Sequence, residues 1–440
     1  MNFKIKFTDK QITPWGGMVL MKRFLDKMGI EKYLREELEL PKQNSNRGYS
    51  PIQLIINFWV GIWCGASKFE HLEVTRFDGI IKEIFGWKVM AGNKSFLRYF
   101  KKFSSSINHQ LFTKLFQWFF TNIKFDKYTL DLDSSVFTRY GDQEGAEKGY
   151  NREKPGRKSH HPLIGFLSEC KMICNIWLRS GSSYTTNNVF YFIEDTLERL
   201  KGKIVGLIRA DSGFFDEKIL EYLEEEDRAI DYIIAGKFYA PIKREIINQK
   251  TWWSIKDGIE VSEVMYKCQN WKKSRRIVIV RQSIKKNSKA TGKELRLFPD
   301  ELFTAKYRYS CFVTNITKLS AAIIWQTYKN RADSENRIKE IKYDFGADSF
   351  NMYEFYGTDA ALNFVIMAYN IMSLFKQTVI QSDVFNRMST LRYTTFGIGG
   401  YTTKNGSQKI LKLSLEMNRR KWFKGLWAQS SDVVFPFVVA

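Results

Sequence analysis

The sequence predicts an α/β fold in which a mostly helical N-terminal region precedes a core of strands and helices. Residues 17–120 carry apolar side chains at helical spacing and few runs rich in β-branched residues. From residue 127 onward, short strand-like runs alternate with helical segments, and residues 237–308 are rich in Trp, Val, Ile and Tyr. At roughly 100–200 residues per domain, a chain of this length predicts two to four domains.

The composition indicates a folded protein with a polyanionic partner. The 440 residues include 69 Lys and Arg against 47 Asp and Glu, a formal net charge of +22, so nucleic acid is the first candidate partner. A hydrophobic content of 44% excludes a disordered basic tail. Five scattered cysteines predict free thiols in a reducing compartment, and the four histidines form no zinc-binding pattern with them. The apolar stretches 51–66 and 360–375 are too short for membrane spans, so we expect no membrane partner.

Residues 1–120 are expected to form a helical DNA-binding region. Residues 93–103 follow a Gly-Asn turn and read as a basic amphipathic helix, on which Lys94 and Arg98 are candidate DNA contacts. An ordinary amphipathic helix with solvated basic side chains explains the same pattern equally well.

The core begins with a strand that carries two acids on one face. Tyr128, Leu130 and Leu132 alternate with polar residues, which places Asp131 and Asp133 on the same face about 7 Å apart. Residues 141–158 are expected to form a mobile loop. The next predicted elements are strands 162–168 and 171–179, a helix 188–200, a strand 204–211 ending in Asp211, a helix reaching Glu226, and a strand 232–235. Three strands, helix, strand, helix, strand is the order of a ribonuclease-H-like core, assigned to residues 121–236 and 309–380.

A basic β-rich insertion, residues 237–308, is expected to interrupt this core between the second and third acids described below. It contains 18 Lys and Arg against 7 Asp and Glu, a bias that suits a phosphate backbone. The core is expected to resume with a strand 304–314, a helix from about Ala321 to Tyr343 and a buried helix 358–378. Residues 381–440 form a basic C-terminal region.

A polar stripe marks the expected helix 321–343. Tyr328, Arg331, Glu335 and Lys342 lie within about 60° of one another at ~100° per residue, so one narrow face carries all four and could line a cleft. An exposed helix face with an Arg331–Glu335 pair is an equally good explanation of the stripe alone.

Three acids from separate elements are expected to converge at the carboxyl edge of the sheet: Asp133, Asp211 and Glu335. Converging carboxylates repel one another, and oxygen ligands of this kind hold hard divalent ions. We therefore expect two Mg²⁺ (or Mn²⁺) ions in each active site, which would support phosphodiester hydrolysis and transesterification.

These residues resemble the DDE transposases of bacterial insertion sequences that carry a Y-R-E-K signature. Tyr328, Arg331, Glu335 and Lys342 match the signature without a gap. Leu132-Asp133-Ser134-Ser135 is similar to the first-acid motif of that family and Arg209-Ala210-Asp211-Ser212 to the second. The segments 142–165 and 334–345 are similar to a branch likened to piggyBac elements.

The resemblance implies cut-and-paste transposition by a cytoplasmic, nucleoid-associated bacterial enzyme. It implies binding of terminal inverted repeats and target DNA by a homodimer, metal-dependent cleavage, often a hairpin intermediate, and strand transfer. It also favours Asp133 over Asp131 as the ligand, and gives Tyr328, Arg331 and Lys342 contacts to end phosphates. In relatives a tryptophan of the insertion can hold a flipped base, for which the candidates here are Trp252, Trp253 and Trp271.

Some alternatives stay open. At least two of these tryptophans are expected to lie in the core of the insertion instead. His160 and His161 could orient water or touch phosphate, although a local structural role is favoured. The competing functions are a ribonuclease-H-like nuclease without strand transfer and a non-catalytic DNA-binding descendant of a transposase.

Overall fold

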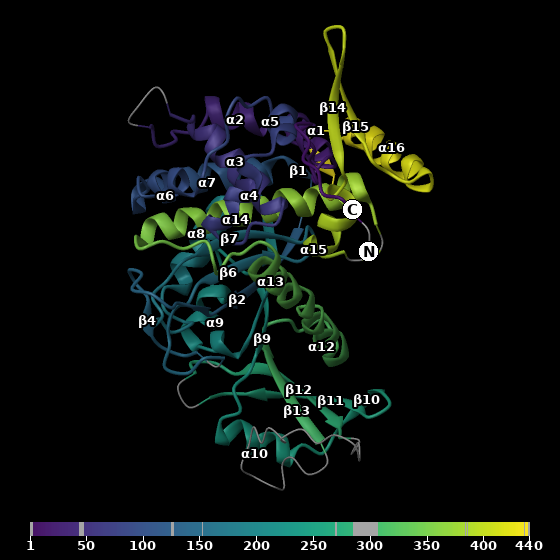
Figure 1. Ribbon diagram of the computed structural model, residues 1–440. Coiled ribbons are helices and arrows are strands. Elements are labelled where there is room, and N and C mark those ends of the chain that lie inside the picture. The colour runs from purple at the N-terminus through teal and green to yellow at the C-terminus, as the bar shows by residue number, and fades with distance from the viewer. Residues whose placement is uncertain are drawn as a thin grey trace.

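The structure is a computed structural model. It describes residues 3–43, 48–124, 127–151, 153–268, 271–284, 307–382, 384, 386–434 and 436–438. Nine of the described strands form one mixed sheet, and helices pack around it (Figure 1). The mixed α/β fold expected from the sequence is therefore confirmed. The spatial order of the strands is β10-β11-β12-β13-β9-β8-β2-β6-β7.

The centre of the sheet is formed by the strands that alternate with helices along the chain. Strand β2 runs parallel to β8, and β8 runs parallel to β9, while β6 and β7 continue the other side as antiparallel neighbours. These strands lie close to the ranges that the sequence predicts, because their apolar runs are nearly continuous and buried on both faces. Their bounds are β2 Lys127–Ser134, β6 Leu163–Leu167, β7 Met172–Trp177, β8 Ile204–Ala210 and β9 Asp231–Ala235.

The described part of the expected insertion extends this same sheet. Strand β13 (Tyr307–Thr314) pairs antiparallel with β9, and β12 (Arg275–Ser283), β11 (Ile259–Tyr266) and β10 (Trp253–Lys256) follow outward. A helix, α10 (Ala240–Asn248), precedes them and was not expected. Residues 285–306 of the insertion lie outside the described residues.

Part of the basic charge of this segment is neutralised within the protein. Three arginines of β12 form ion pairs at 2.9 Å or closer: Arg275 with Glu224, Arg276 with Glu263, and Arg281 with Glu260. These guanidinium groups therefore stabilise the sheet extension and are not free for a phosphate backbone.

The segment 141–158, expected to be a mobile loop, contributes β4 and the first residue of β5 to a second, small sheet, so it is not a loop throughout. Strand β5 (Lys158–His160) pairs with β3 (Phe137–Thr138) on one side and β4 (Glu147–Lys148) on the other. Strands of two or three residues give no periodic signal, which explains why the polar, glycine-containing sequence read as a loop.

A layer of helices covers the edge strand β7 of the sheet through α14 (Phe355–Phe375) (Figure 1). Helix α14 packs on β7 with one side and on α3, α6 and α7 with the other. The helices before the sheet are α1 Met18–Met28, α2 Ile30–Glu36, α3 Pro51–Trp63, α4 Glu73–Arg76, α5 Gly79–Phe85, α6 Asn93–Phe100 and α7 Ser105–Thr121, with a 3₁₀ turn Phe69–Leu72 before α4. The expected helical N-terminal region is thus present.

Two further helices, α8 (Val189–Leu200) and α9 (Glu217–Glu224), connect the central strands and lie where the sequence places them. After β13 the chain forms α12 (Ala321–Lys329) and α13 (Ala332–Asp344). The C-terminal region contains α15 (Met388–Leu391), a hairpin of β14 (Gly400–Asn405) and β15 (Gln408–Leu413), and α16 (Met417–Asp432). The last strand, β16 (Phe437–Val438), pairs parallel with β1 (Ile123–Lys124).

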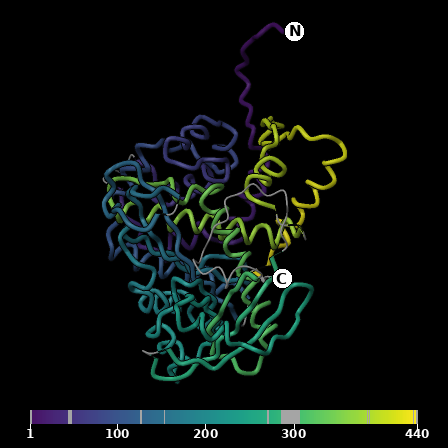
Figure 2. Tube along the Cα trace, turned by 90° about the horizontal axis from the view of Figure 1, so that it is seen from below, coloured from purple at the N-terminus to yellow at the C-terminus, as the bar shows by residue number. Residues whose placement is uncertain are grey.

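The two ends of the chain lie near the helical layer. Figure 2 shows the first residues projecting from the body of the protein beside the C-terminal hairpin and α16. Helix α1 packs against α16, where the guanidinium of Arg23 lies 4.0 Å from the ring centre of Trp427. The C-terminal region is therefore packed against the N-terminal helices.

Helix α14 is long and apolar enough to cross a membrane by length and composition, but 94% of its most apolar window is buried in the protein. The indole nitrogen of Trp59 donates to the backbone carbonyl of Phe364 at 2.9 Å, and that of Trp63 donates to the backbone carbonyl of Ala368 at 3.1 Å. These partners come from α3, so α14 is a core helix that holds the helical layer to the sheet.

Asn370 of α14 closes the edge of strand β7. Its side-chain oxygen accepts from the backbone nitrogen of Ile173 at 2.9 Å, and its side-chain nitrogen donates to the carbonyl of Ile173 at 2.7 Å. The amide side chain therefore takes the place of a further strand, and it explains the polar residue inside an apolar stretch.

We expect Asn370→Leu to lower the free energy of unfolding by about 3 kcal/mol, because two buried backbone groups of Ile173 lose their partners. Urea unfolding measures the change. The matched control is Asn363→Leu on the same helix, whose side-chain nitrogen bonds only within α14, to Asp359. Equal losses in the two variants would contradict this role of Asn370.

Candidate active site

Two of the three predicted acids lie side by side at the carboxyl ends of adjacent parallel strands. Leu132 of β2 is paired with Ala210 of β8. The residues that follow them, Asp133 and Asp211, therefore lie next to each other. Asp211 begins a short 3₁₀ turn, and its Oδ1 accepts from the backbone nitrogen of Gly213 at 2.8 Å. The parallel register thus fixes both carboxylates at one edge of the sheet.

The third acid, Glu335, lies on α13, and the single helix expected here is in fact two. Helix α12 ends at Lys329 and α13 begins at Ala332, with Arg331 at the junction. The hydroxyl of Ser334 donates to the carbonyl of Arg331 at 2.7 Å, a local bond that competes with helix continuity. The sequence offers no Pro or Gly here, so the break was not predictable from helix breakers.

Despite this break, the Y-R-E-K residues face the end of β2 and the segment after it. Arg331 donates to the carbonyl of Leu132 at 3.2 Å, and the Lys342 Nζ donates to the carbonyl of Val136 at 3.2 Å. The ring of Tyr328 packs on Phe312 of β13 with 4.4 Å between ring centres. Tyr328, Arg331 and Lys342 therefore line the sheet edge, whereas the side chain of Glu335 is 52% exposed and is joined to the edge through Arg331.

Arg331 connects two of the acids. Its guanidinium lies 3.1 Å from the Oδ2 of Asp133 and 2.8 Å from the Oε1 of Glu335, and the side chain is only 5% exposed. Neighbouring carboxylates raise the pKa of Arg331 although its burial lowers it. The expected phosphate contact of Arg331 is thus not an exposed one, because the side chain lies among the acids.

The charges at this site perturb two further groups. Burial raises the pKa of Asp133 to about 6; Arg331 opposes the shift, while Asp211 and Glu335 add to it. Burial also raises the pKa of Tyr328 to about 12, with the same three acids contributing. Asp133, Asp211, Glu335 and Tyr328 are therefore close enough to act on one another, and the phenol of Tyr328 stays protonated at neutral pH.

The acids fit a divalent cation by their chemistry. Within the described ranges, no three His, Cys, Asp or Glu side chains stand together as a ready-made metal site. All three candidates nevertheless offer carboxylate oxygens, the donors that hard divalent ions prefer. Burial is the main cause of the raised pKa of Asp133, Asp211 and Glu335 add to it, and an added cation would favour the charged carboxylate.

Asp131, which shares a face with Asp133, has a structural partner. Its two oxygens accept from the Arg209 guanidinium at 2.6 and 2.8 Å, and Arg209 also donates to the Ser168 hydroxyl and the Thr327 carbonyl. Both charged side chains are at most 3% exposed. This buried pair ties β2, β8 and the end of α12 together directly below the site.

The two histidines have different surroundings. The Nδ1 of His160 accepts from the Nε of Arg139 at 2.9 Å, and its Nε2 lies 2.9 Å from the carbonyl of Glu144, so its role is structural. The Nδ1 of His161 lies 3.0 Å from the carbonyl of Ser183. Burial lowers the pKa of His161, and the charge of Asp211 partly opposes this, which places His161 beside the acids.

Sequence reasoning missed the segment that flanks Asp211. Arg179 donates to the carbonyls of His161, Tyr184 and Asn187 and so shapes the loop after β7. From this loop, the hydroxyl of Thr185 lies 3.4 Å from that of Ser134, next to Asp133. One arginine after a strand gives no sequence signal for this role.

The tryptophans of the insertion differ in exposure. Trp271 is 6% exposed and packs against Phe215 and Tyr266, so its assignment as a base-stacking residue was wrong for this conformation. Trp252 donates to the carbonyl of Gln249 and lies under the guanidinium of Arg281, near Tyr309. Trp253 is 49% exposed and stays the candidate for stacking.

The basic residues of α6 lie where the sequence predicts. Lys94 and Arg98 are exposed one turn apart on α6, while Phe96, Tyr99 and Phe100 are buried on the other side. This arrangement fits both explanations of the helix, so the DNA contacts of Lys94 and Arg98 stay a prediction.

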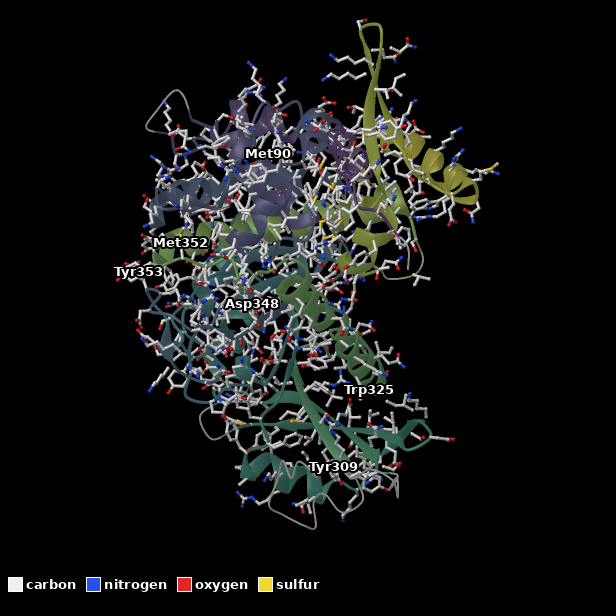
Figure 3. The ribbon with its side chains drawn as sticks, viewed as in Figure 1. Met90, Tyr309, Trp325, Asp348, Met352 and Tyr353 are labelled. Atoms are coloured by element: carbon white, nitrogen blue, oxygen red, sulfur yellow. The ribbon has the colours of Figure 1, made fainter. Side chains whose placement is uncertain are left out.

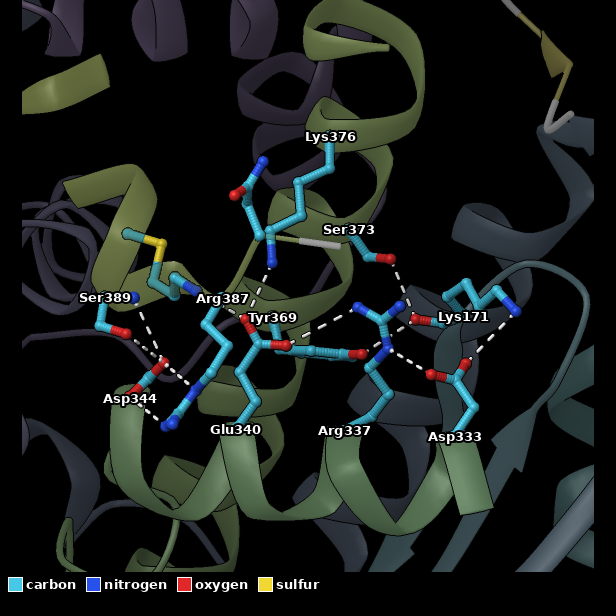
Figure 4. A network of polar contacts seen from close by, with 12 residues as sticks. Lys171, Asp333, Arg337, Glu340, Asp344, Tyr369, Ser373, Lys376, Arg387 and Ser389 are labelled. Atoms are coloured by element: carbon cyan, nitrogen blue, oxygen red, sulfur yellow. Dashed lines mark hydrogen bonds and ion pairs between the residues drawn. The ribbon is translucent and has the colours of Figure 1, made fainter. Parts of the chain in front are cut away.

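The back of α13 is anchored by a network of ion pairs (Figure 4). The Oε1 of the fully buried Glu340 accepts from the Lys376 Nζ at 2.8 Å and from the Met388 nitrogen at 2.7 Å. One turn further, Asp344 accepts from Arg387 at 2.9 and 3.2 Å. The helix that carries Glu335 on one side is thus fixed on the other side to α14 and α15.

Acids on adjacent strands and a helix, in a strongly basic chain, define an enzyme acting on phosphodiester bonds. Residues 1–431 match the family model of the transposase DDE domain, group 1. The chain therefore belongs to this family, and it is a DNA transposase; enzymes of this kind depend on divalent cations. No curated protein matches the chain.

The chain is also similar to a solved structure, the piggyBac transposase in a cryo-EM structure of its synaptic complex with hairpin DNA. The sequences are 11% identical, the TM-score is 0.46, and the match covers 88% of this chain and 81% of that chain.

Glu340→Gln is expected to lower the free energy of unfolding by about 3 kcal/mol, because the buried ammonium of Lys376 loses the carboxylate that lies 2.8 Å from it. Chemical denaturation checks this. The double variant Glu340→Gln, Lys376→Met removes both charges and should recover part of the loss. A double variant less stable than either single variant would contradict the pairing.

His160 predicts a pH dependence of stability. Burial lowers its pKa to about 4, against about 6.5 in an unfolded chain, so the unfolded state binds the proton first as the pH falls. The His160 contribution is fully present above pH 6.5 and is lost between pH 6.5 and 4, by up to about 3 kcal/mol. Denaturation at several pH values should show a flatter profile for His160→Gln over this interval, whereas parallel profiles would refute it.

Proposed function

We propose that this transposase acts by cut-and-paste, with Asp133, Asp211 and Glu335 holding two Mg²⁺ (or Mn²⁺) ions at the end of the central strands. The observation that carries the proposal is the adjacency of Asp133 and Asp211 in the parallel register, with Glu335 joined to Asp133 through Arg331. Bound divalent ions would activate water or a 3′-hydroxyl and stabilise the leaving oxygen.

The residues around the acids supply positioning and charge. Tyr328 keeps its proton at neutral pH and is available to donate a hydrogen bond to a phosphate oxygen. Lys342 bonds only a backbone carbonyl in the described structure, so its charge is available for a phosphate beside the site. Arg331 neutralises part of the charge of Asp133 and Glu335. When a bound cation takes over this neutralisation, the planar guanidinium of Arg331 can form two parallel hydrogen bonds to a phosphate.

The central strands support a ribonuclease-H-like assignment for residues 121–236 and 309–380. Strand β6 runs antiparallel to β2, and β7 runs antiparallel to β6. Strands β8 and β9 run parallel to β2, with α8 and α9 as the connections. The strands β10 to β12 then form the insertion between the second and third acids, and residues 1–120 and 381–440 complete the chain.

The partners we propose are terminal inverted repeats and target DNA. The exposed Lys94 and Arg98 are assigned to backbone contacts, and the half-exposed Trp253 to a base, which includes the flipped base of a hairpin end. Two ends must be cut and joined in one complex, which favours a homodimer on DNA in the cytoplasm of a bacterium.

Excision of a marked DNA segment bounded by the native flanks of the gene tests the proposal. The parent protein in Mg²⁺ should excise, and Asp133→Asn or Asp211→Asn should reduce excision at least 10³-fold while end binding stays within about two-fold, because each removes a ligand charge. The control is Asp131→Asn, which removes an acid from the same face of the strand. Because Asp131 binds Arg209, any loss of excision in this variant should parallel its loss of stability. Excision by Asp133→Asn equal to the parent would refute the assignment.

The same assay separates the competing function. A nuclease without strand transfer would cut the ends but leave no joined product in an added target plasmid. Joined products from the parent, and none when EDTA removes the divalent ions, would establish transposition.

A further inference from the structure

A polar cavity opens beside the active site, on the side of Lys342. Its volume is about 420 Å³, and fourteen residues line it, among them Val136, Tyr140, Lys154, Lys342, Tyr343 and Asp348. Lys342 links this cavity to the active site, because its Nζ donates to the carbonyl of Val136, three residues after Asp133. Figure 3 shows Asp348 in the middle of the molecule, between the helical layer and the strands.

The small sheet β3-β5-β4 fixes one wall of the cavity. Arg139, buried after β3, donates to the Nδ1 of His160 on β5 and to the carbonyl of Asp348. The other wall comes from the end of α13, which supplies Lys342 and Tyr343. Both walls are therefore held by contacts within the fold, and these contacts define the space between them.

The charge of the cavity is positive. Its lining contains four basic residues, Lys68, Arg139, Lys154 and Lys342, and two acidic ones, Glu153 and Asp348. Within the described residues, no ion pair joins Lys68, Lys154 or Lys342 to an acid. A second cavity of about 430 Å³ shares Arg139 and Tyr140 and adds the basic Lys148, Arg157 and Lys158, of which Lys158 is paired with Asp142 at 2.7 Å. The surplus positive charge suits an anionic ligand.

Two exposed tyrosines stand at this positive site. Tyr140 is 68% exposed and Tyr343 is 62% exposed, although both rings are large and amphipathic. The Lys154 Nζ lies 4.8 Å and the Arg157 guanidinium 5.8 Å from the centre of the Tyr140 ring. Lys154 also donates to the hydroxyl of Tyr140, and no ion pair joins it to an acid in the described part of the chain. Exposed aromatic rings interleaved with such cations are the combination that binds unpaired nucleotides, with the rings stacking on bases and the cations holding phosphates.

We propose that this cavity binds the single-stranded DNA that leaves the active site, with a base on Tyr140 or Tyr343 and its phosphates on Lys154 and Lys342. A cavity of this volume admits a nucleotide, whereas a duplex does not enter it. The inference rests on the proposed function, because the strand next to the cleaved bond is the DNA that reaches the cavity. It assigns substrate contacts to Tyr140, Tyr343 and Lys154, which lie outside the Y-R-E-K signature.

Fluorescence anisotropy with a labelled 20-nucleotide single strand, and with the matching duplex, tests the proposal on the full chain without divalent ions. Tyr140→Ala should weaken single-strand binding roughly 10-fold and duplex binding less than about two-fold, and Tyr140→Phe should restore the affinity because the ring remains. Lys154→Ala should reduce the salt dependence of single-strand binding by about 0.7 in the log–log slope.

The matched controls are Tyr191→Ala, an exposed tyrosine of α8, and Lys32→Ala on α2; neither should change single-strand affinity. Unchanged single-strand affinity in Tyr140→Ala and Lys154→Ala would overturn the proposal. An equal loss for single strand and duplex would also overturn it, in favour of a duplex-binding surface. The measurement needs no catalysis, so it succeeds or fails independently of the excision assay.

Discussion

The repulsion between carboxylates at one edge of the sheet is the constraint on which the rest of the site depends. Asp133 and Asp211 are brought together by backbone pairing, which the side chains cannot relax, and Glu335 is added from a separate helix. A single guanidinium, that of Arg331, offsets this repulsion from a nearly buried position. Burial, with smaller contributions from Asp211 and Glu335, still raises the pKa of Asp133, so a further cation would stabilise its charged form.

Such a site needs a rigid support. The ion pairs on the side of α13 that faces away from the acids supply this support. Glu340 and Asp344 bind groups from α14, α15 and the segments beside them (Figure 4). Elsewhere on α13, Lys342 donates to the carbonyl of Val136 and Glu335 pairs with Arg331. Below the acids, the buried pair of Asp131 and Arg209 joins β2 and β8 to the end of α12. The mutual repulsion of the acids is thus opposed by charge pairs that lie outside the reaction space.

The sequence predicted the central strands and the three acids because both have local signals. The apolar run 204–210 ends directly at Asp211, and the alternation around Asp131 and Asp133 is that of a strand. It could not assign Asp131, since its partner Arg209 is 78 residues away and becomes a neighbour only through the parallel pairing. The same limit applies to Arg331, whose predicted phosphate contact came from a motif while its burial depends on the fold.

The small sheet of strands β3, β4 and β5 shows a second limit. Its strands are two or three residues long, so their sequence is dominated by the polar and glycine residues between them, and periodicity cannot detect them. Tertiary contacts hold this segment instead: His160 binds Arg139, and Arg139 binds the carbonyl of Asp348, 209 residues further along the chain. Basic and aromatic residues that read as a solvated loop are thereby placed next to the catalytic helix.

Because of this placement, Lys342 belongs both to the candidate active site and to the positive cavity. It is the last residue of the signature on α13, and it also lines the positive cavity with Tyr140 and Tyr343. A phosphate bound by Lys342 would therefore lie between the acids and the tyrosines, so that a strand cut at the acids passes directly into the cavity. The insertion is less suited to this role, because three of its arginines are already paired with glutamates. Among the described residues, Lys154 and Lys342 line this cavity without an ion pair to an acid, so positive charge lies on the wall formed by the small sheet and the end of α13.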